Sequence, residues 1–232
     1  MSEPRPRAVV YTDFDGVLNA FAGADGVRAS GGGGTFRLDG EAVVPAGSAA
    51  YTVRWSHALA ADMAALARDG VIELVWLSTW QPYTAALNAT LGWDGRDVRT
   101  AQWYDPVTYT GLRGGKLRTV VRRIAIEDAS TTPLPIVWID DEECTERAGR
   151  VIESADPPAP VCIVRPDSRI GVSRRQWRLV RAFIDDPTAF APVTLDVEPG
   201  VAEREGHLGL GAVGERRARA GGTWLTARVA FL

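Results

Sequence analysis

The sequence predicts an α/β fold in which a parallel sheet is covered by helices on both faces. Short apolar segments alternate with segments of helical spacing, and each apolar segment is hydrophobic at nearly every position. Strands of a parallel sheet are buried on both faces and carry this continuous pattern. The expected strands are residues 8–13, 71–77, 135–139 and 161–164.

The helices expected between these strands carry start and stop signals. Pro82 suits the first position of a helix, and Gly92 suits a C-terminal cap. Ser173, followed three residues later by Gln176, is typical of a capping box at a helix start. We therefore expect helices over residues 56–68, 81–91, 114–127 and 173–184, and one more that ends at about residue 154.

Residues 20–50 interrupt this alternation. They contain four successive glycines, Gly31–Gly34, and then an Asp39–Gly40 pair between two short alternating segments. An Asp-Gly pair in that setting is a strong signal for the turn of a β-hairpin. We expect a glycine-rich loop and a hairpin that hangs over the end of the first strand, where loops of α/β domains often carry function. The alternative is a surface insertion without a role.

Length and composition indicate one main domain. The chain has 232 residues, 46% of them hydrophobic, and a formal net charge of -3. Such a length suits one domain with additions, or at most two small ones. The negative net charge excludes a positive electrostatic field over the whole protein that would attract nucleic acid. Binding of nucleic acid by local clusters of basic residues is not excluded. We expect a domain over residues 1–192 and a loosely ordered tail over residues 193–232, where Gly, Glu, Arg and Ala dominate.

Cysteine and histidine usage excludes several kinds of site. Cys144 and Cys162 form neither a disulfide framework nor a C-x-x-C pattern, which favours a reducing, cytoplasmic setting. His57 and His207 lie far apart in the sequence, so a His-based zinc site or catalytic triad is not expected. The first residues lack a signal-peptide core, and no apolar stretch is long enough to span a bilayer. We therefore expect no membrane association.

Two carboxylates follow the first expected strand. Asp13 and Asp15 are one residue apart, and Gly16 comes directly after them. In extended backbone, positions i and i+2 lie on the same side, so the two side chains would point together. A hard cation such as Mg²⁺ would relieve their repulsion, and a carboxylate beside such an ion can attack phosphorus. The alternative is a plain strand and an Asp-Gly turn with solvated carboxylates.

Other polar side chains stand at strand ends or helix starts. Ser78 follows the second strand, where a hydroxyl either contacts phosphate or caps the next helix. Asp140 and Asp141 follow the third strand, where they either bind the same metal or stabilise a helix N-terminus. Lys116 lies in a first helical turn, which disfavours a cation unless an anion lies opposite. Ligands of open α/β sheets bind at the carboxyl edge, so one geometry explains all these positions.

These segments resemble, in order, the four motifs of the haloacid-dehalogenase-like (HAD) superfamily. Asp13–Asn19 resembles the first motif, and Ser78 resembles the hydroxyl of the second. Lys116 resembles the third-motif lysine, and Asp140–Asp141 resembles the acidic fourth motif. The resemblance covers about residues 8–185 and implies a three-layer, Rossmann-like HAD fold.

A closer resemblance is to the small HAD domains found with RNA-repair proteins, the Swiss army knife group. It is carried by residues 75–80, 138–142 and 165–173. No large cap domain fits between the motifs, so the hairpin within residues 20–50 would be a small flap and the only lid. A small lid leaves the site open, which suits a macromolecular or extended substrate and equally a small phosphate ester.

The resemblance implies catalytic roles for the first motif. Asp13 would be the nucleophile that forms an aspartyl-phosphate, and also a metal ligand. Asp15 would act as general acid and then as general base, with its backbone carbonyl on the metal. The presence of both residues favours hydrolysis of phosphate esters over dehalogenation. The physics agrees, because phosphoryl transfer depends mainly on positioning and on neutralisation of charge.

The resemblance also implies which residues would bind the phosphoryl group and the metal. Ser78, or Thr79 in its place, would hold a phosphoryl oxygen, and Gly16 would lie against the phosphate. Lys116 would act in catalysis by neutralising the charge of the phosphoryl group and of the nucleophile. The implied cofactor is Mg²⁺, and Asp141 would be its more direct ligand with Asp140 in support. The full implied ligand set is Asp13, Asp15, Asp140 and Asp141.

The predicted function is therefore a Mg²⁺-dependent phosphatase, a phosphoric monoester hydrolase, with nucleic-acid ends or nucleotides among its candidate substrates. One alternative is a HAD-fold module that binds a phosphorylated ligand or nucleic acid without turnover. Another is a phosphotransferase, which needs an acceptor better placed than water.

Two arginine-rich segments are candidates for contact with a nucleic-acid backbone. The alternative for both is a solvated helix face balanced by nearby acidic residues. The first segment comprises Arg113, Lys116, Arg118, Arg122 and Arg123, and the second comprises Arg165, Arg169, Arg174, Arg175, Arg178 and Arg181.

Overall fold

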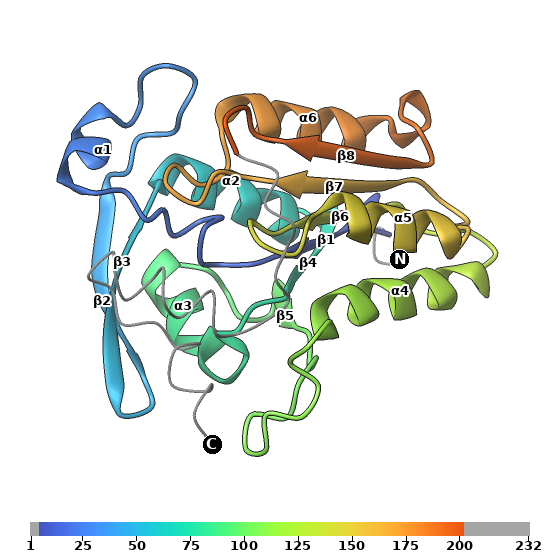
Figure 1. The fold of residues 1–232 in the computed structure, drawn as a ribbon, viewed down its shortest axis with the longest axis horizontal. Coiled ribbons are helices and arrows are strands. Elements are labelled where there is room, and N and C mark those ends of the chain that lie inside the picture. Colours follow the sequence, from blue (N-terminus) through green and yellow to red (C-terminus); the bar gives the residue numbers. More distant parts are fainter. Residues whose placement is uncertain (1–4, 202–232) are drawn as a thin grey trace.

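The computed structural model describes residues 5–201, which build a six-stranded sheet and a separate two-stranded hairpin (Figure 1). All neighbouring strands of the large sheet pair in parallel. In spatial order they are β5 (Val98–Thr100), β4 (Ile72–Trp76), β1 (Ala8–Thr12), β6 (Ile136–Ile139), β7 (Val161–Arg165) and β8 (Val193–Val197).

The chain order of these strands makes the sheet doubly wound. Numbered along the chain without the hairpin, the six strands lie in the order 3-2-1-4-5-6, the order of Rossmann-like folds. The chain moves outward from β1 through β4 to β5, and then returns to place β6 on the other side of β1. The carboxyl ends of β1 and β6 therefore flank the crevice in which such sheets bind ligands.

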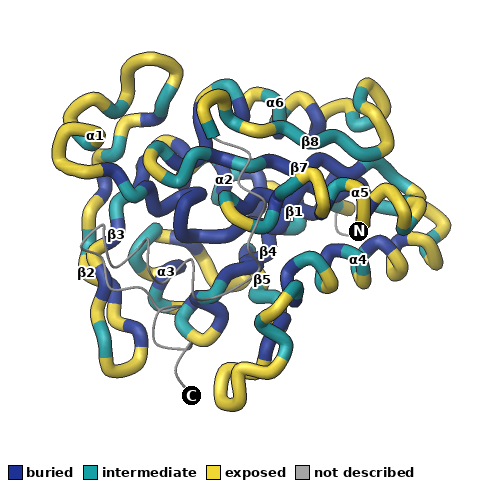
Figure 2. Tube along the Cα trace, viewed as in Figure 1, coloured by how far each residue is buried: buried dark blue, intermediate teal, exposed yellow. Residues whose placement is uncertain are grey.

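Helices cover both faces of the sheet, so the predicted three-layer α/β architecture is confirmed (Figures 1 and 2). In β1, Val10 lies in a core with Met63, whereas its neighbour Val9 lies in a second core with Ile124. This alternation explains why the strand is apolar at successive positions. One face carries α2 (His57–Arg68), α3 (Thr84–Leu91) and α6 (Arg174–Asp185), and the other carries α4 (Gly115–Asp128) and α5 (Glu146–Ser154).

The local signals for helix ends are largely confirmed. Gly92 caps α3 in the left-handed region at φ 71°. Ser173 and Gln176 form the predicted capping box at the start of α6. The helix expected from residue 81 begins instead with a 3₁₀ turn, η1 (Gln81–Tyr83), that carries Pro82 and leads directly into α3.

The predicted position of the hairpin turn is wrong. The hairpin consists of β2 (Gly40–Ala46) and β3 (Ala49–Trp55), and its turn lies at Gly47, where φ is 63°. Asp39 directly precedes β2 and so lies outside the turn. Its carboxylate accepts a hydrogen bond from the backbone N–H of His57 at 3.0 Å. Gly40 is needed for close packing, because a Cβ there would lie 2.3 Å from the Trp55 ring.

The region before the hairpin also departs from the expectation of a loop. It contains a short exposed helix, α1 (Ala24–Ala29), with no buried residue (Figure 2). The hairpin itself packs on the domain, since its inner residues Val44, Tyr51 and Val53 belong to the hydrophobic core. Along the chain, the hairpin links the first strand of the sheet to α2.

The sheet extends beyond the predicted domain boundary at residue 192. Strand β8 pairs with β7, and Arg175 binds the Asp196 carboxylate through both terminal nitrogens at 2.6 and 2.8 Å. Val193–Val197 alternates apolar and polar residues, as expected for a half-buried edge strand. The rest of the predicted tail, residues 202–232, lies outside the described residues, as does His207. Within residues 5–201, no helix is both long enough and apolar enough to cross a bilayer.

Candidate active site

The polar residues singled out in the sequence gather at the carboxyl edge of the sheet. Asp13 follows β1, Ser78 follows β4 by two residues, and Asp140–Asp141 follows β6. Lys116 reaches the same place from the first turn of α4. The position is the crevice beside β1 and β6 that the topology predicts.

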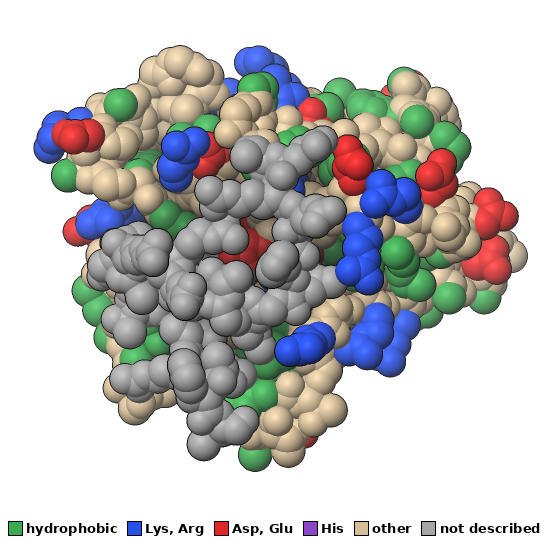
Figure 3. Space-filling view, viewed as in Figure 1, with side chains coloured by type: hydrophobic (Ala, Val, Ile, Leu, Met, Phe, Trp, Pro, Cys, Tyr) green, Lys and Arg blue, Asp and Glu red, His purple; other side chains and the backbone are tan. Residues whose placement is uncertain are grey.

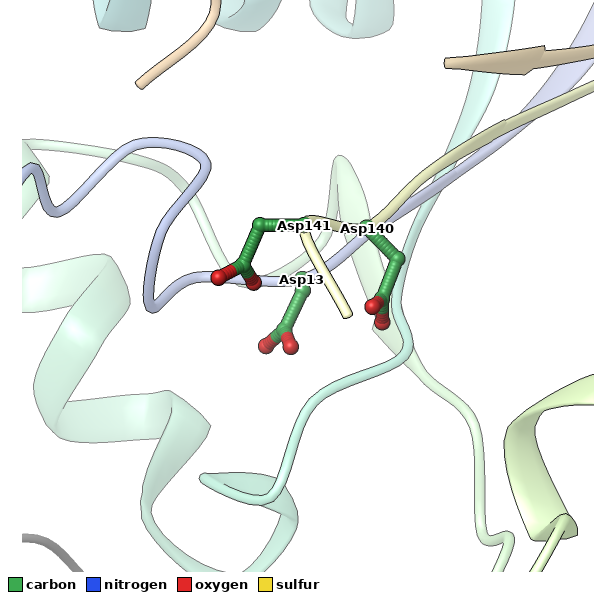
Figure 4. A group of neighbouring side chains, drawn as sticks. All are labelled: Asp13, Asp140 and Asp141. Carbon is green, nitrogen blue, oxygen red and sulfur yellow. The ribbon is translucent and has the colours of Figure 1, made fainter. Parts of the chain in front are cut away.

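Three carboxylates form one group at this edge. Ligand oxygens of Asp13, Asp140 and Asp141 all lie within 4.8 Å of one another. Figure 4 shows Asp13 entering from the end of β1 and the other two from the adjoining end of β6. Among the described residues, neither histidine nor cysteine belongs to this group, and His57 instead packs against the Trp55 ring. A set of carboxylate oxygens is the donor type that hard divalent cations prefer.

Lys116 bridges two members of this group. Its Nζ donates to Oδ2 of Asp13 at 2.5 Å and to Oδ2 of Asp140 at 2.7 Å. All three side chains are buried. Lys116 is also the only lysine in the sequence. A compact ammonium ion on a flexible stem suits the space between two close carboxylates better than a planar guanidinium group does.

The remaining oxygens of the bridged carboxylates are held by the backbone. Oδ1 of Asp13 accepts from the backbone N–H of Phe14 at 2.6 Å. Oδ1 of Asp140 accepts from the N–H groups of Glu142 and Glu143 at 2.9 and 2.6 Å. The Asp140 carboxylate therefore both pairs with Lys116 and fixes the turn that carries Asp141. It does not cap the helix that follows, because the N-cap of α5 is Thr145.

Burial and crowding shift the ionisation of the site. Burial, with a further contribution from Asp140, raises the pKa of Asp13 to about 6, while Lys116 and the Ser78 hydroxyl act against this rise. Burial acts to lower the pKa of Lys116, but the two carboxylates outweigh it and hold that pKa well above its ordinary value. Burial also raises the pKa of Glu143 to about 7. Between about pH 4 and pH 7, Asp13 and Glu143 of the metal-free folded protein therefore bind protons that the unfolded chain would release.

These shifts predict how the stability of the metal-free protein depends on pH. Asp13 and Glu143 have ordinary pKa values of 3.8 and 4.5 when unfolded, and both are raised in the folded protein. The folded state therefore binds more protons, and the free energy of unfolding falls as pH rises from about 4 to about 7. Urea unfolding in chelator at several pH values measures this fall. Asp13→Asn and Glu143→Gln should each flatten it, whereas the exposed Glu146→Gln should not. A stability that rises over this range would contradict the assignment.

The backbone from Asp13 to Asp15 is not the extended strand from which the sequence predicted that the two side chains point together. The strand ends at Thr12, and the following loop turns back so that Phe14 O accepts from the N–H groups of Leu18 and Asn19. The Asp15 carboxylate is buried, lies outside the group formed by the other three, and binds different partners. Asn19 donates to it at 2.7 Å, and Trp80 donates at 3.1 Å.

Ser78 and Thr79 lie in a loop that aromatic side chains fix. The Ser78 hydroxyl accepts from the backbone N–H of Trp80 at 3.2 Å, and its carbonyl accepts from Trp103 Nε1 at 3.0 Å. The carbonyl of Thr79 accepts from the Tyr104 hydroxyl at 3.0 Å. The aromatic residues after α3 therefore cover the core and also position this loop. Ser78 therefore stabilises this loop but does not cap the next helix, since the N-cap of η1 is Trp80 and no side chain caps it.

Gly16 is required for the position of Asp141. Its φ is 71°, and a Cβ at this position would lie 2.2 Å from Cγ of Asp141. Gly16→Ala should therefore displace the Asp141 carboxylate and strongly reduce the increase in melting temperature that Mg²⁺ produces. Gly92→Ala is the matched control, because Gly92 has the same φ of 71° and no atom within 4 Å of the added Cβ. Equal responses of the two variants to Mg²⁺ would contradict a role for Gly16 in shaping the site.

Among the described residues, four of the ten arginines of the two basic segments pair with acidic residues, namely Arg123, Arg169, Arg175 and Arg181. Arg123 binds Glu73 through two nitrogens at 2.8 Å each, and Arg181 binds Asp62 at 2.9 Å. Arg165 donates to the backbone carbonyl of Asp141 at 3.0 Å, so it supports the site itself. For these four arginines, the pairs favour the interpretation of balanced helix faces. Figure 3 nevertheless shows basic side chains gathered over α4 and α5 on one face.

Comparison of the chain with protein-family models, with curated proteins and with solved structures gives no match.

Proposed function

We propose that the protein is a Mg²⁺-dependent phosphohydrolase of the HAD type, which acts on phosphoric monoesters through an aspartyl-phosphate at Asp13. The observation that carries the proposal is the bridge from Lys116 to Asp13 and Asp140 beside Asp141. A lysine, a nucleophile and two further carboxylates meet at the switch point of a doubly wound sheet. Four separate segments of the chain that resemble HAD motifs supply these side chains and the nearby Ser78.

The residues divide the reaction between them. An oxygen of Asp13 would attack phosphorus, and Asp15 would protonate the leaving oxygen and later accept a proton from the attacking water. Lys116 would offset the charge that develops on the phosphoryl oxygens, and the Ser78 hydroxyl would hold one of them. Lys116 also keeps Asp13 ionised against the effect of burial, which a carboxylate nucleophile requires.

The carboxylate group fits a magnesium ion. Its donors are hard oxygens on three side chains, and Gly16 leaves the space that Asp141 needs. Asp13 and Asp141 would hold the ion, with Asp140 in support because its carboxylate binds two backbone N–H groups of the turn that carries Asp141. A bound Mg²⁺ would neutralise charge on the phosphate and fix its orientation.

The hairpin β2–β3 would serve as the small flap of this enzyme. It lies beside α3, and the Tyr51 ring meets Trp80 edge-on with ring centres 5.7 Å apart. Among the described residues, it is the one insertion between the sheet strands that forms a second sheet. Such a site would accept an extended substrate as well as a small one. Phosphorylated nucleic-acid ends are one candidate substrate, because the basic side chains over α4 and α5 could contact the phosphate backbone (Figure 3).

Release of inorganic phosphate tests the proposal. The substrates are a generic aryl phosphate and oligonucleotides with a 3′- or 5′-phosphate, each with Mg²⁺ and with chelator. The proposal expects release that needs the metal, and the preferred substrate would decide whether nucleic-acid ends are used. Folded protein that binds Mg²⁺ but releases phosphate from none of these substrates would favour a binding module without turnover.

A further inference from the structure

The Asp15 carboxylate is held at both oxygens by neutral side-chain donors. Asn19 Nδ2 donates to Oδ1 at 2.7 Å, and Trp80 Nε1 donates to Oδ2 at 3.1 Å. All three residues are buried, with at most 3% of their surface exposed. A carboxylate with one donor on each oxygen cannot rotate without breaking a hydrogen bond. Each oxygen has two lone pairs, so each keeps a position for a proton.

Trp80 is itself fixed by surrounding contacts. Its ring meets Phe14 and Tyr51 edge-on, with ring centres 5.5 and 5.7 Å apart. Its backbone N–H donates to the Ser78 hydroxyl. Phe14 lies between Asp13 and Asp15 in sequence, and Tyr51 belongs to β3, so the indole joins the first loop to the hairpin.

Asn19 is fixed by the same hairpin. Its Oδ1 accepts from the backbone N–H of Arg54 in β3 at 2.8 Å. The carbonyl of Arg54 accepts in turn from the N–H of Ala20 at 3.0 Å. Asn19 is thus hydrogen-bonded on one side to Asp15 and on the other to the end of β3. Both contacts of Asp15 therefore lead to the hairpin, through Asn19 and through Trp80.

We propose that Trp80 and Asn19 are positioning residues that hold Asp15 in the orientation of an acid–base group, and that the hairpin is the scaffold that fixes both. The inference rests on the proposed phosphohydrolase function. As the bond from Asp13 to phosphorus forms and the bond to the leaving oxygen breaks, the Asp15 proton passes to that oxygen. When water then attacks phosphorus, Asp15 takes a proton from it. Each transfer needs the carboxyl group to face the reacting oxygen.

The test compares two leaving groups in the variant Trp80→Phe, which keeps an aromatic ring but lacks the N–H donor. A 4-nitrophenyl leaving group is stable as an anion and needs little protonation, whereas the alkoxide that leaves glycerol phosphate depends on it. Trp80→Phe should lower kcat/KM for glycerol phosphate by about 10-fold to 100-fold, a part of the ~10²–10⁴-fold that acid–base catalysis contributes. It should lower kcat/KM for 4-nitrophenyl phosphate much less. Asn19→Ala should give the same pattern.

Two controls separate positioning from a general structural effect. Trp93→Phe removes another buried indole donor, one that binds the carbonyl of Ala60 at 3.0 Å, and should leave both kcat/KM values unchanged. The second control is the double variant Asp15→Ala/Trp80→Phe. Its ratio of kcat/KM values for the two substrates should equal that of Asp15→Ala alone, because Trp80 acts through Asp15 and the two effects are therefore not additive. Circular dichroism would confirm that each variant is folded.

The outcomes distinguish this inference from the proposed function. Release of phosphate by the wild type, with a loss in Trp80→Phe and Asn19→Ala that is larger for the alkyl ester, supports the inference. An equal loss for both esters, or the same loss in Trp93→Phe, would overturn it while the phosphohydrolase function stands. A folded, metal-bound wild type that hydrolyses neither ester would overturn the function and, with it, the inference.

Discussion

Replacement of Asp13 by Asn is expected to lower phosphate release by about 10⁴-fold or more, because an amide cannot form the aspartyl-phosphate. The variant should remain folded. Burial, with a further contribution from Asp140, raises the pKa of Asp13 to about 6, so removal of its charge removes a cost of desolvation as well as the repulsion from Asp140. We therefore expect Asp13→Asn to unfold at a higher urea concentration than the wild type at pH 7 in chelator.

The combination of lost activity and gained stability is the informative result, since it excludes unfolding as the cause. Asp62→Asn is the matched control, because Asp62 also binds two side chains, Trp177 and Arg181, but far from the site in the contact between α2 and α6. It should keep full activity. Activity that survives Asp13→Asn would contradict the role of Asp13 as nucleophile.

Replacement of Lys116 by Met is expected to have the largest effect on stability. The Lys116 ammonium group is buried between Asp13 and Asp140, and its removal leaves two close carboxylates without a cation. Removal of one partner from a buried ion pair typically costs about 3–5 kcal/mol. Activity should fall by about 10²–10³-fold, as it does when a group that stabilises transition-state charge is removed. Urea unfolding and initial rates of phosphate release measure the two effects.

The loss of stability in Lys116→Met should depend on conditions. Acid should reduce it, because protonation of a carboxylate removes the repulsion, and Mg²⁺ should reduce it at neutral pH. Arg150→Met is the control, since Arg150 pairs with Glu146 at an exposed position where ion pairs contribute about 1 kcal/mol or less. A stability change in Lys116→Met no larger than in Arg150→Met would contradict the bridge from Lys116 to the two carboxylates.

The parallel sheet and the edge that carries the site could be predicted from sequence, because both follow from short-range patterns. Strands such as β1 and β6 are buried at every position and almost entirely apolar, and Asp13 and Asp140 follow their ends. One topological rule then places all strand ends at the same edge. The single lysine is a further signal in the sequence. Lys116 is the only lysine among many arginines, which marks a position where a compact cation is required.

The errors arose where distant residues decide local structure. Asp39–Gly40 has the sequence of a turn, but Asp39 binds the backbone of His57 and Gly40 makes room for the Trp55 ring. The contacts of Asp15 with Trp80 and of Asn19 with Arg54 join residues 65 and 35 positions apart. No periodic pattern encodes such contacts, so their roles emerge only from the folded chain.

Chemical trapping of the phosphorylated residue tests the central claim most directly. Borohydride reduces an acyl phosphate to an alcohol, so a phosphorylated aspartate becomes homoserine and loses mass. Wild-type protein would be mixed with an aryl phosphate and Mg²⁺, treated with borohydride, digested and analysed by mass spectrometry. We expect homoserine at position 13 of the wild-type protein. It should appear at no other aspartate, and it should not form when chelator is present. Active protein that shows no modification at Asp13, or shows it at another residue, would contradict the assignment of Asp13 as the nucleophile.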